Sequence, residues 1–100
     1  MTPYRFHSEA EEELEQTASF YESRVVGLGK AFALEVERTV LAIREHPDLG
    51  SPLGTKTRRV LVHRFPYSLV YLHFVDHILI LAVAHHHRRP GYWRNRASAR

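Results

Sequence analysis

Apolar residues recur every three or four positions between Ala10 and Val25, as they do on one face of an amphipathic helix. We therefore predict a helix over about residues 9–25. Ser8 precedes this stretch and Glu11 lies three residues further on. This spacing predicts a capping box, in which the two side chains bind backbone N–H groups of the first helical turn.

A second helix is predicted over about residues 28–46, after a break at two glycines. It should end before Pro47, because the residue preceding a proline disfavours helical backbone. Two long helices joined by so short a connection form an antiparallel hairpin. The predicted buried stripe consists of Leu28, Phe32, Val36, Val40 and Ile43. Leu34 and Leu41 form a second apolar seam, which we also expect to contact the core.

The remainder of the chain has the alternating pattern and turn residues of β-strands. Three strands are predicted, over residues 58–64, 67–75 and 77–85. A short first strand is expected at residues 3–7, and the stretch 48–56 reads as a loop. The order β-α-α-β-β-β predicts an α+β fold, with the helical hairpin packed on one face of a mostly antiparallel sheet.

The length of 100 residues predicts a single domain, with a basic C-terminal tail over about residues 88–100. The N-terminus becomes acidic where a secretory signal would be apolar, and the apolar stretch 78–84 is too short to cross a bilayer. There is no cysteine for a disulfide. We therefore expect a cytoplasmic protein with no membrane partner.

Charge is divided unevenly along the chain. Residues 1–50 contain five Lys or Arg and ten Asp or Glu, a net charge of −5, whereas residues 51–100 contain nine Lys or Arg and one Asp, a net charge of +8. The basic half could bind an anionic partner. Alternatively, acidic helices could simply pack against basic strands, and the sequence leaves both interpretations open.

The three histidines His85, His86 and His87 invite comparison with a zinc site. Successive side chains on a strand point to opposite faces, so His85 and His86 should diverge. No cysteine lies nearby, and the nearest acidic residue is Asp76, at the far end of the predicted strand. We expect exposed imidazoles at a strand end, with no metal and no cofactor.

Arginines flank the predicted strands, and guanidinium groups bind phosphate in a bidentate manner. They are Arg58, Arg59, Arg64, Arg88 and Arg89. If the strands are neighbours, these groups converge; the alternative is a charged sheet edge that prevents edge-to-edge pairing. Because Arg58 and Arg59 are adjacent on one strand, they cannot both face the same side.

Tyr92 and Trp93 stand among these arginines, where aromatic rings could stack on bases. They could equally hold the tail against the rest of the chain; we favour anchoring for Trp93 and leave Tyr92 open. The glutamates at positions 9–15 read as a solvated helix face. No serine stands in a G-x-S-x-G nucleophile motif.

Three motifs carry a resemblance to a known family: Phe65-Pro66-Tyr67 leading into Val70-Tyr71, the ending "HHHRRPGYW", and the helix junction from Phe20-Tyr21-Glu22 to Phe32 and Glu35. With them, nearly the whole chain resembles the RelE/ParE family of toxins from bacterial type II toxin–antitoxin systems. The resemblance implies a compact β-α-α-β-β-β toxin and a cognate antitoxin that wraps it. RelE-like members cut mRNA in the ribosomal A site, whereas ParE-like members poison DNA gyrase.

The resemblance matches the RelE-like cleavage site only in part. A RelE-like catalytic arginine directly follows the tyrosine that opens the central strand, but here Ser68 follows Tyr67. Losing one such charge stabiliser costs several kcal/mol of barrier. The residues that would be catalytic in a RelE-like enzyme are Arg59, His86, Arg88 and Tyr92. Contacts to a target or nucleic acid would come from Arg58, Arg64, His85, His87 and Arg89.

Three hypotheses follow. The first is a toxin that acts by binding, ParE-like and directed at gyrase or at an undetermined target, and neutralised by its antitoxin. The second is a RelE-like, ribosome-dependent mRNA endoribonuclease. The third is a non-catalytic nucleic-acid-binding module that relies on the basic half of the chain.

Overall fold

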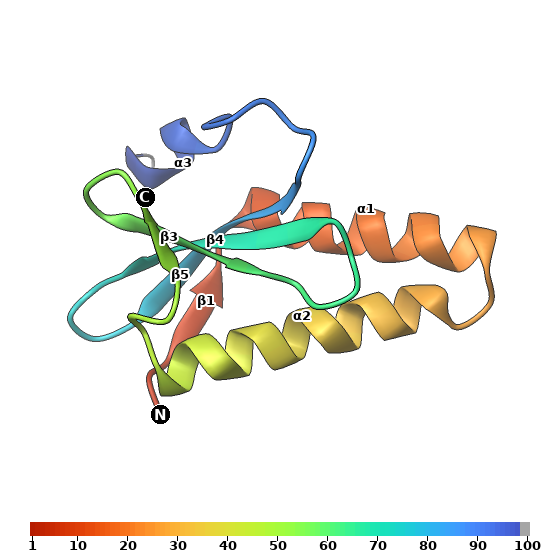
Figure 1. The fold of residues 1–100 in the computed structure, drawn as a ribbon, viewed down its shortest axis with the longest axis horizontal. Helices are drawn as coiled ribbons and strands as arrows, with labels where there is room; N and C mark the ends of the chain where they lie inside the picture. Colours follow the sequence, from red (N-terminus) through yellow and green to blue (C-terminus); the bar gives the residue numbers. More distant parts are fainter. Residues whose placement is uncertain (99–100) are drawn as a thin grey trace.

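The computed structural model describes residues 1–98. Its elements, in chain order, are β1 (Tyr4–Phe6), α1 (Ser8–Arg24), α2 (Leu28–Glu45), β2 (Ser51–Leu53), β3 (Thr57–Leu61), β4 (Tyr67–His73), β5 (Ile78–His85) and α3 (Arg94–Ser98) (Figure 1). The predicted α+β fold, with a helical hairpin packed on a sheet, is confirmed. The predicted basic tail is described as far as residue 98; residues 99 and 100 lie outside the described part.

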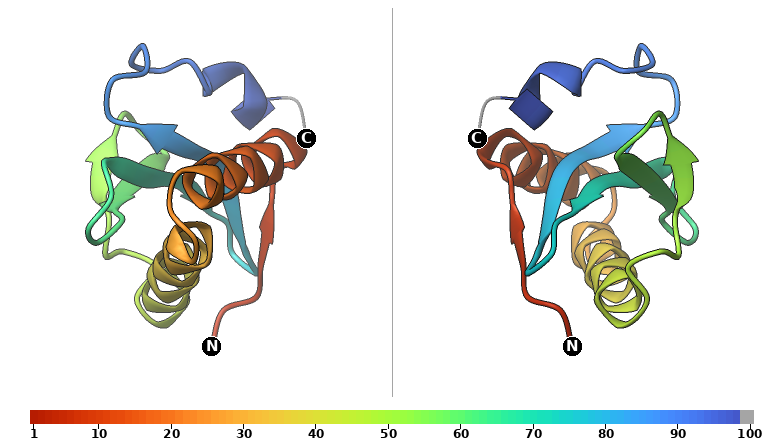
Figure 2. Two further views of the ribbon diagram at one scale, coloured as in Figure 1. Left: turned by 90° about the vertical axis from the view of Figure 1, so that its right-hand side faces the viewer. Right: turned by 90° about the vertical axis from the view of Figure 1, so that its left-hand side faces the viewer.

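The five strands form one sheet in the order β1-β5-β4-β3-β2. Strand β1 runs parallel to β5, and the other neighbours are antiparallel, so the sheet is mostly antiparallel as predicted. The central pair β4 and β5 contains an irregularity between Val70 and Tyr71. Helix α2 and the tail lie on opposite sides of the sheet (Figure 2).

Alternating side chains of β4 and β5 divide the buried residues into two layers. Leu69, Tyr71 and Ile80 point toward the helices, where they pack with Phe32 and Ile43. The opposite layer is filled by apolar side chains of the sheet and by the tail tryptophan: Val70, Leu72, Leu79, Leu81, Ala82 and Trp93. Both faces of the sheet are therefore covered, one by the hairpin and the other in part by the tail.

The helical hairpin is closed by two glycines and one carboxylate. Gly27 adopts a left-handed φ of 88°, which lets the chain reverse directly into α2. The Glu22 carboxylate accepts hydrogen bonds from the N–H groups of Gly27 at 2.7 Å and Gly29 at 2.9 Å. A Cβ atom at Gly29 would overlap the carbonyl oxygen of Ala18, so only glycine lets the two helices approach this closely.

Two predictions about the helices are wrong. The capping box at Ser8 does not form: His7 is the N-cap, and its Nδ1 accepts a hydrogen bond from the Glu9 N–H at 3.1 Å, so Ser8 is already helical. Leu34 and Leu41 do not contact the core, because they are 45% and 46% exposed on the outer side of α2. The helix turns one apolar stripe inward, and the second seam falls outside its width.

Two predictions about the strands need correction. The predicted loop 48–56 contains β2, which pairs with β3 at the sheet edge. Strand β3 ends at Leu61, although the prediction extended it to Arg64. Arg64 has a left-handed φ of 74°, so it belongs to the turn before β4. In the described part of the chain, no helix is long and apolar enough to cross a membrane.

Candidate functional site

A cavity of about 220 Å³ lies between the sheet face opposite the helices and the tail. Its side chains are mostly basic or aromatic, and they come from β3, β4, the end of β5 and the tail. The polar and aromatic lining residues are Arg59, Ser68, His85, His86, Arg88, Arg89, Tyr92, Trp93 and Arg94. Segments far apart in the sequence thus meet at one concave surface.

The structure brings most of the predicted site residues to this cavity. Six of them line it: Arg59, His85, His86, Arg88, Arg89 and Tyr92. Arg58 instead bonds the Gly50 carbonyl at 2.7 Å, which follows the expectation that it diverges from Arg59. Arg64 stands in the turn before β4, with its guanidinium 5.6 Å from the Phe65 ring centre.

Ser68 and His86 form the polar floor of the cavity. Ser68 is 2% exposed in β4, and its Oγ shares a hydrogen bond of 3.1 Å with Nε2 of the exposed His86. The His86 N–H also donates to the Pro66 carbonyl at 2.9 Å, which holds the backbone just beyond β5. Ser68 therefore orients an imidazole at the cavity.

His85 points to a different set of neighbours. Its ring meets Tyr67 edge-on at 5.0 Å between ring centres and His87 at 5.1 Å, and its Nδ1 accepts a hydrogen bond from the His87 N–H at 3.0 Å. Burial, followed by the charges of His87 and His86, lowers the pKa of His85. The neutral form of this imidazole is therefore favoured more than in a free histidine.

Tyr92 and Trp93 anchor the tail. Trp93 is 7% exposed in the layer beneath the tail, which confirms the anchoring interpretation. The Tyr92 hydroxyl donates to Glu13 Oε2 at 2.8 Å, and the Arg88 guanidinium lies 3.8 Å from the Tyr92 ring centre. Burial raises the pKa of Tyr92 and Glu13 raises it further, so the phenol keeps its proton.

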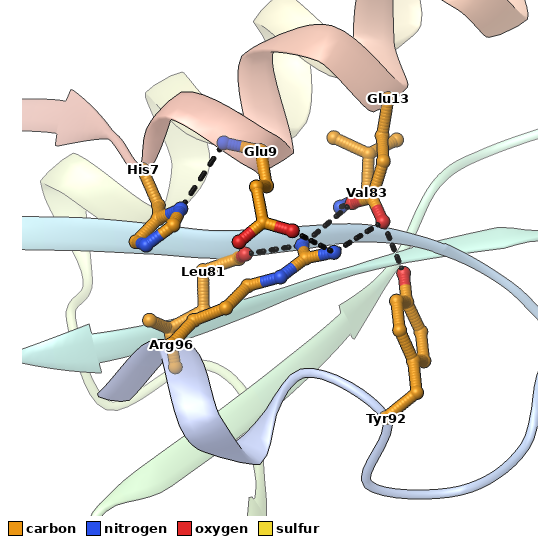
Figure 3. Close-up of polar contacts among 7 residues, drawn as sticks. All are labelled: His7, Glu9, Glu13, Leu81, Val83, Tyr92 and Arg96. Carbon is orange, nitrogen blue, oxygen red and sulfur yellow. Dashed lines mark hydrogen bonds and ion pairs between the residues drawn. The ribbon is translucent and has the colours of Figure 1, made fainter. Parts of the chain in front are cut away.

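Glu13 was not predicted as a site residue, because the glutamates at positions 9–15 read as a solvated helix face. The side chain is only 15% exposed and points toward β5 and the tail (Figure 3). Glu13 lies three residues after the buried Ala10, on the inward side of α1, and this spacing is the signal that could have singled it out. The glutamate run is therefore not uniform, because one of its members is a largely buried hydrogen-bond acceptor.

The arrangement is suited to binding anions. Four arginines line one concave surface, and guanidinium groups form charge-assisted hydrogen bonds with phosphate or carboxylate oxygens. Among residues 1–98, no three His, Asp or Glu side chains come together as metal ligands would. His86 adds to these guanidinium groups an imidazole, a side chain that can both donate and accept hydrogen bonds.

Comparison with known proteins adds a family. Residues 4–90 match the model of the family described as the ParE toxin of type II toxin–antitoxin systems, parDE. Among solved structures, the chain is similar to one described as the chromosomal ParDE toxin–antitoxin system from P. aeruginosa, with a TM-score of 0.71 and 19% sequence identity over 85% of this chain and 96% of that chain. At that identity, the likeness shows a shared fold. No curated protein matches the chain significantly.

Proposed function

Since the chain belongs to the ParE toxin family of type II toxin–antitoxin systems, we propose that the basic cavity binds the cellular target of this toxin, and that the target is DNA gyrase. As the toxin component of such a system, the protein has an antitoxin as its partner. The proposal places its action in the cytoplasm, where gyrase works. The toxin then inhibits growth by binding, without a chemical step of its own.

This proposal rests on two features of the cavity: the hydrogen bond and pKa of Tyr92, and the presence of a serine at position 68. The Tyr92 hydroxyl is already donated to Glu13, and its pKa is raised by burial, so it is poorly placed to accept a proton from RNA. Ser68 occupies the position of the RelE-like arginine, which removes one stabiliser of a phosphorane. The remaining arginines are sufficient for binding but form an incomplete catalytic set.

His86 favours a second candidate function, a RelE-like mRNA endoribonuclease. Its imidazole is exposed, shares a hydrogen bond with Ser68 and lines the same cavity as Arg59 and Arg88. A general base beside two guanidinium groups is compatible with attack of a 2′-hydroxyl on a phosphodiester. In this second function, His86 would have to carry out the proton transfer that Tyr92 cannot perform.

The two functions are separated by three assays on the same protein, expressed with and without its antitoxin. We expect growth arrest without the antitoxin and loss of gyrase supercoiling activity on a relaxed plasmid. Primer extension on translated mRNA should show no new cuts. Codon-linked cuts with intact gyrase activity would instead establish the nuclease, and unimpaired growth with folded protein would count against both.

Single substitutions test whether the cavity is the binding surface. Arg59→Ala and Arg89→Ala should each weaken gyrase inhibition by about tenfold or more, because each removes a charge-assisted contact. Arg5→Ala is the matched control, because it removes an exposed arginine from β1, the edge strand that β5 and β4 separate from β3. Equal loss of inhibition in all three variants would indicate an effect of net charge and not of this site.

A further inference from the structure

We propose that Glu13 is a positioning residue for the cavity: its carboxylate holds the C-terminal tail on the sheet and thereby places the tail arginines at the site. Glu13 does not line the cavity itself. The consequence for target binding rests on the proposed function, whereas the attachment of the tail does not depend on what the target is.

Both oxygens of the Glu13 carboxylate are fully used (Figure 3). Oε1 accepts from the Val83 N–H at 2.9 Å and from Arg96 Nη1 at 3.0 Å. Oε2 accepts from the Tyr92 hydroxyl at 2.8 Å and from Arg96 Nη2 at 2.9 Å. One carboxylate on α1 is thus bonded to β5 and to two residues of the tail, and its pairing with Arg96 is bidentate.

Arg96 is the tail residue on which this attachment depends most. Its side chain is 7% exposed, and Nη1 also donates to the Leu81 carbonyl at 2.9 Å. Glu9 lies 3.7 Å from Nη2 and is largely exposed. A guanidinium this deeply buried needs a charged partner, because an unpaired buried charge is strongly unfavourable. Of the two glutamates within 3.7 Å of this guanidinium, Glu13 is the less exposed and makes the closer contact, so it supplies most of that charge.

The attached tail carries a large part of the cavity. Gly91, Tyr92, Trp93 and Arg94 line it from the tail side, and Arg88 is held over the Tyr92 ring. Without the tail, the polar lining from the sheet would be reduced to Arg59, Ser68 and the histidines at and just after the end of β5, beside apolar residues of β2, β4 and β5. Residues 91–98 lie beyond the residues that match the family model, so this attachment is a feature that the family match does not cover.

The substitution Glu13→Gln tests the proposal. The amide oxygen can still accept from Val83, but the charge that pairs with Arg96 is lost. Trp93 is the only tryptophan of the chain, so its emission reports directly on the tail. We expect a red-shifted emission and about tenfold faster trypsin cleavage after Arg94 and Arg96. Glu12→Gln, at an exposed position of the same helix, is the control and should behave as the unsubstituted protein.

A spectroscopic signature distinguishes this role from general destabilisation. Glu13 contributes to the raised pKa of Tyr92. In an absorbance titration, the phenol that ionises at the highest pH should therefore ionise at a lower pH in Glu13→Gln. Tyr92→Phe identifies that phenol by its disappearance. Circular dichroism should remain that of the folded sheet and hairpin in both variants. If Glu13→Gln cannot be purified folded, Arg96→Lys tests the attachment by Trp93 emission and tail cleavage, because lysine keeps the charge but cannot make the bidentate contact.

Gyrase inhibition completes the test. We expect Glu13→Gln to weaken it by about tenfold or more, comparable to removal of a cavity arginine, and Glu12→Gln to leave it unchanged. Two results would overturn the proposal: a tail as protected as in the unsubstituted protein, or a released tail with full inhibition. If the unsubstituted protein fails to inhibit gyrase, the proposed target is wrong, while Trp93 emission and tail cleavage still decide whether Glu13 holds the tail.

Discussion

Because Gly29 has no side chain, the two helices of the hairpin can approach each other closely. Gly29 lies against the carbonyl oxygen of Ala18, and a Cβ atom there would overlap it. The nearby Glu22 carboxylate accepts hydrogen bonds from two otherwise unpaired N–H groups at the start of α2. The glycine therefore serves packing, and the glutamate serves backbone hydrogen bonding, within the same turn.

Gly29→Ala should lower the free energy of unfolding by about 1–3 kcal/mol, because a methyl group is forced into a filled space. Urea unfolding followed by circular dichroism measures this difference. The neighbouring Lys30→Ala, at an exposed helical position, should change it by less than about 0.5 kcal/mol. A neutral Gly29→Ala would mean that the helices separate at no cost, in conflict with the packing described.

The elements differ in how far their own sequence determined them. Both long helices follow from apolar periodicity, and four of the strands, β1, β3, β4 and β5, follow from alternation and turn residues. Strand β2 could not be predicted, because three residues that include Pro52 have no pattern of their own and become a strand only by pairing with β3. Periodicity also gives the direction of a helix face but not its width, which is why Leu34 and Leu41 were misplaced.

Helix α2 has one buried and one exposed apolar face, and substitutions should separate them. Phe32→Ala should cost about 3–5 kcal/mol, since this side chain is fully buried among Tyr21, Phe65 and Tyr67. Leu34→Ala, two residues further on, should cost less than about 1 kcal/mol. Urea unfolding of the two variants checks this. Similar losses would mean that the exposed seam is packed after all.

The site was predicted less completely than the fold, for a reason of distance along the chain. The arginines, histidines and aromatic residues could be named because they cluster in the sequence. The partners of Glu13 could not, since Val83, Tyr92 and Arg96 lie 70, 79 and 83 residues away from it. The charge of Glu13 suggests solvent, and only the assembled fold shows which groups its carboxylate binds.

At the scale of the whole molecule, both interpretations of the uneven charge find a place. Acidic and basic halves meet inside the fold where Glu13 and Glu9 approach Arg96. Four other arginines remain exposed around the cavity, at positions 59, 88, 89 and 94. Their positive charge would attract an anionic partner. Part of the basic charge therefore stabilises the structure, and part of it is left for binding.

Stability should also depend on pH in a direction that follows from three groups. The Gly27 N–H lowers the pKa of Glu22, the His77 ring lowers that of Asp76, and burial lowers that of His85. Each binds fewer protons folded than unfolded, so the free energy of unfolding rises with pH. Each group contributes its full stabilisation above its ordinary pKa, which is 4.5 for Glu22, 3.8 for Asp76 and 6.5 for His85. This stabilisation is lost as the pH falls through the lower pKa of the folded state.

Burial raises the pKa of Tyr71 and Tyr92, so each binds more protons folded, and stability falls as pH rises above 10.0. We therefore expect a maximum between about pH 7 and about pH 10 in urea unfolding followed by circular dichroism. Glu22→Gln should flatten the acid side alone. A protein that becomes more stable on acidification below 6.5 would contradict this account.

The pairing of β1 with β5 has a consequence for the order in which the toxin is made. Strand β1 is synthesised before its partner β5, which begins only at Ile78, and the residues that hold the tail are added later still. Contacts between such distant segments form late in folding. A nascent chain that ends before β5 contains both helices of the hairpin, but it lacks the complete sheet and the cavity. The sheet and the cavity therefore cannot be completed before the chain has been extended to Arg96.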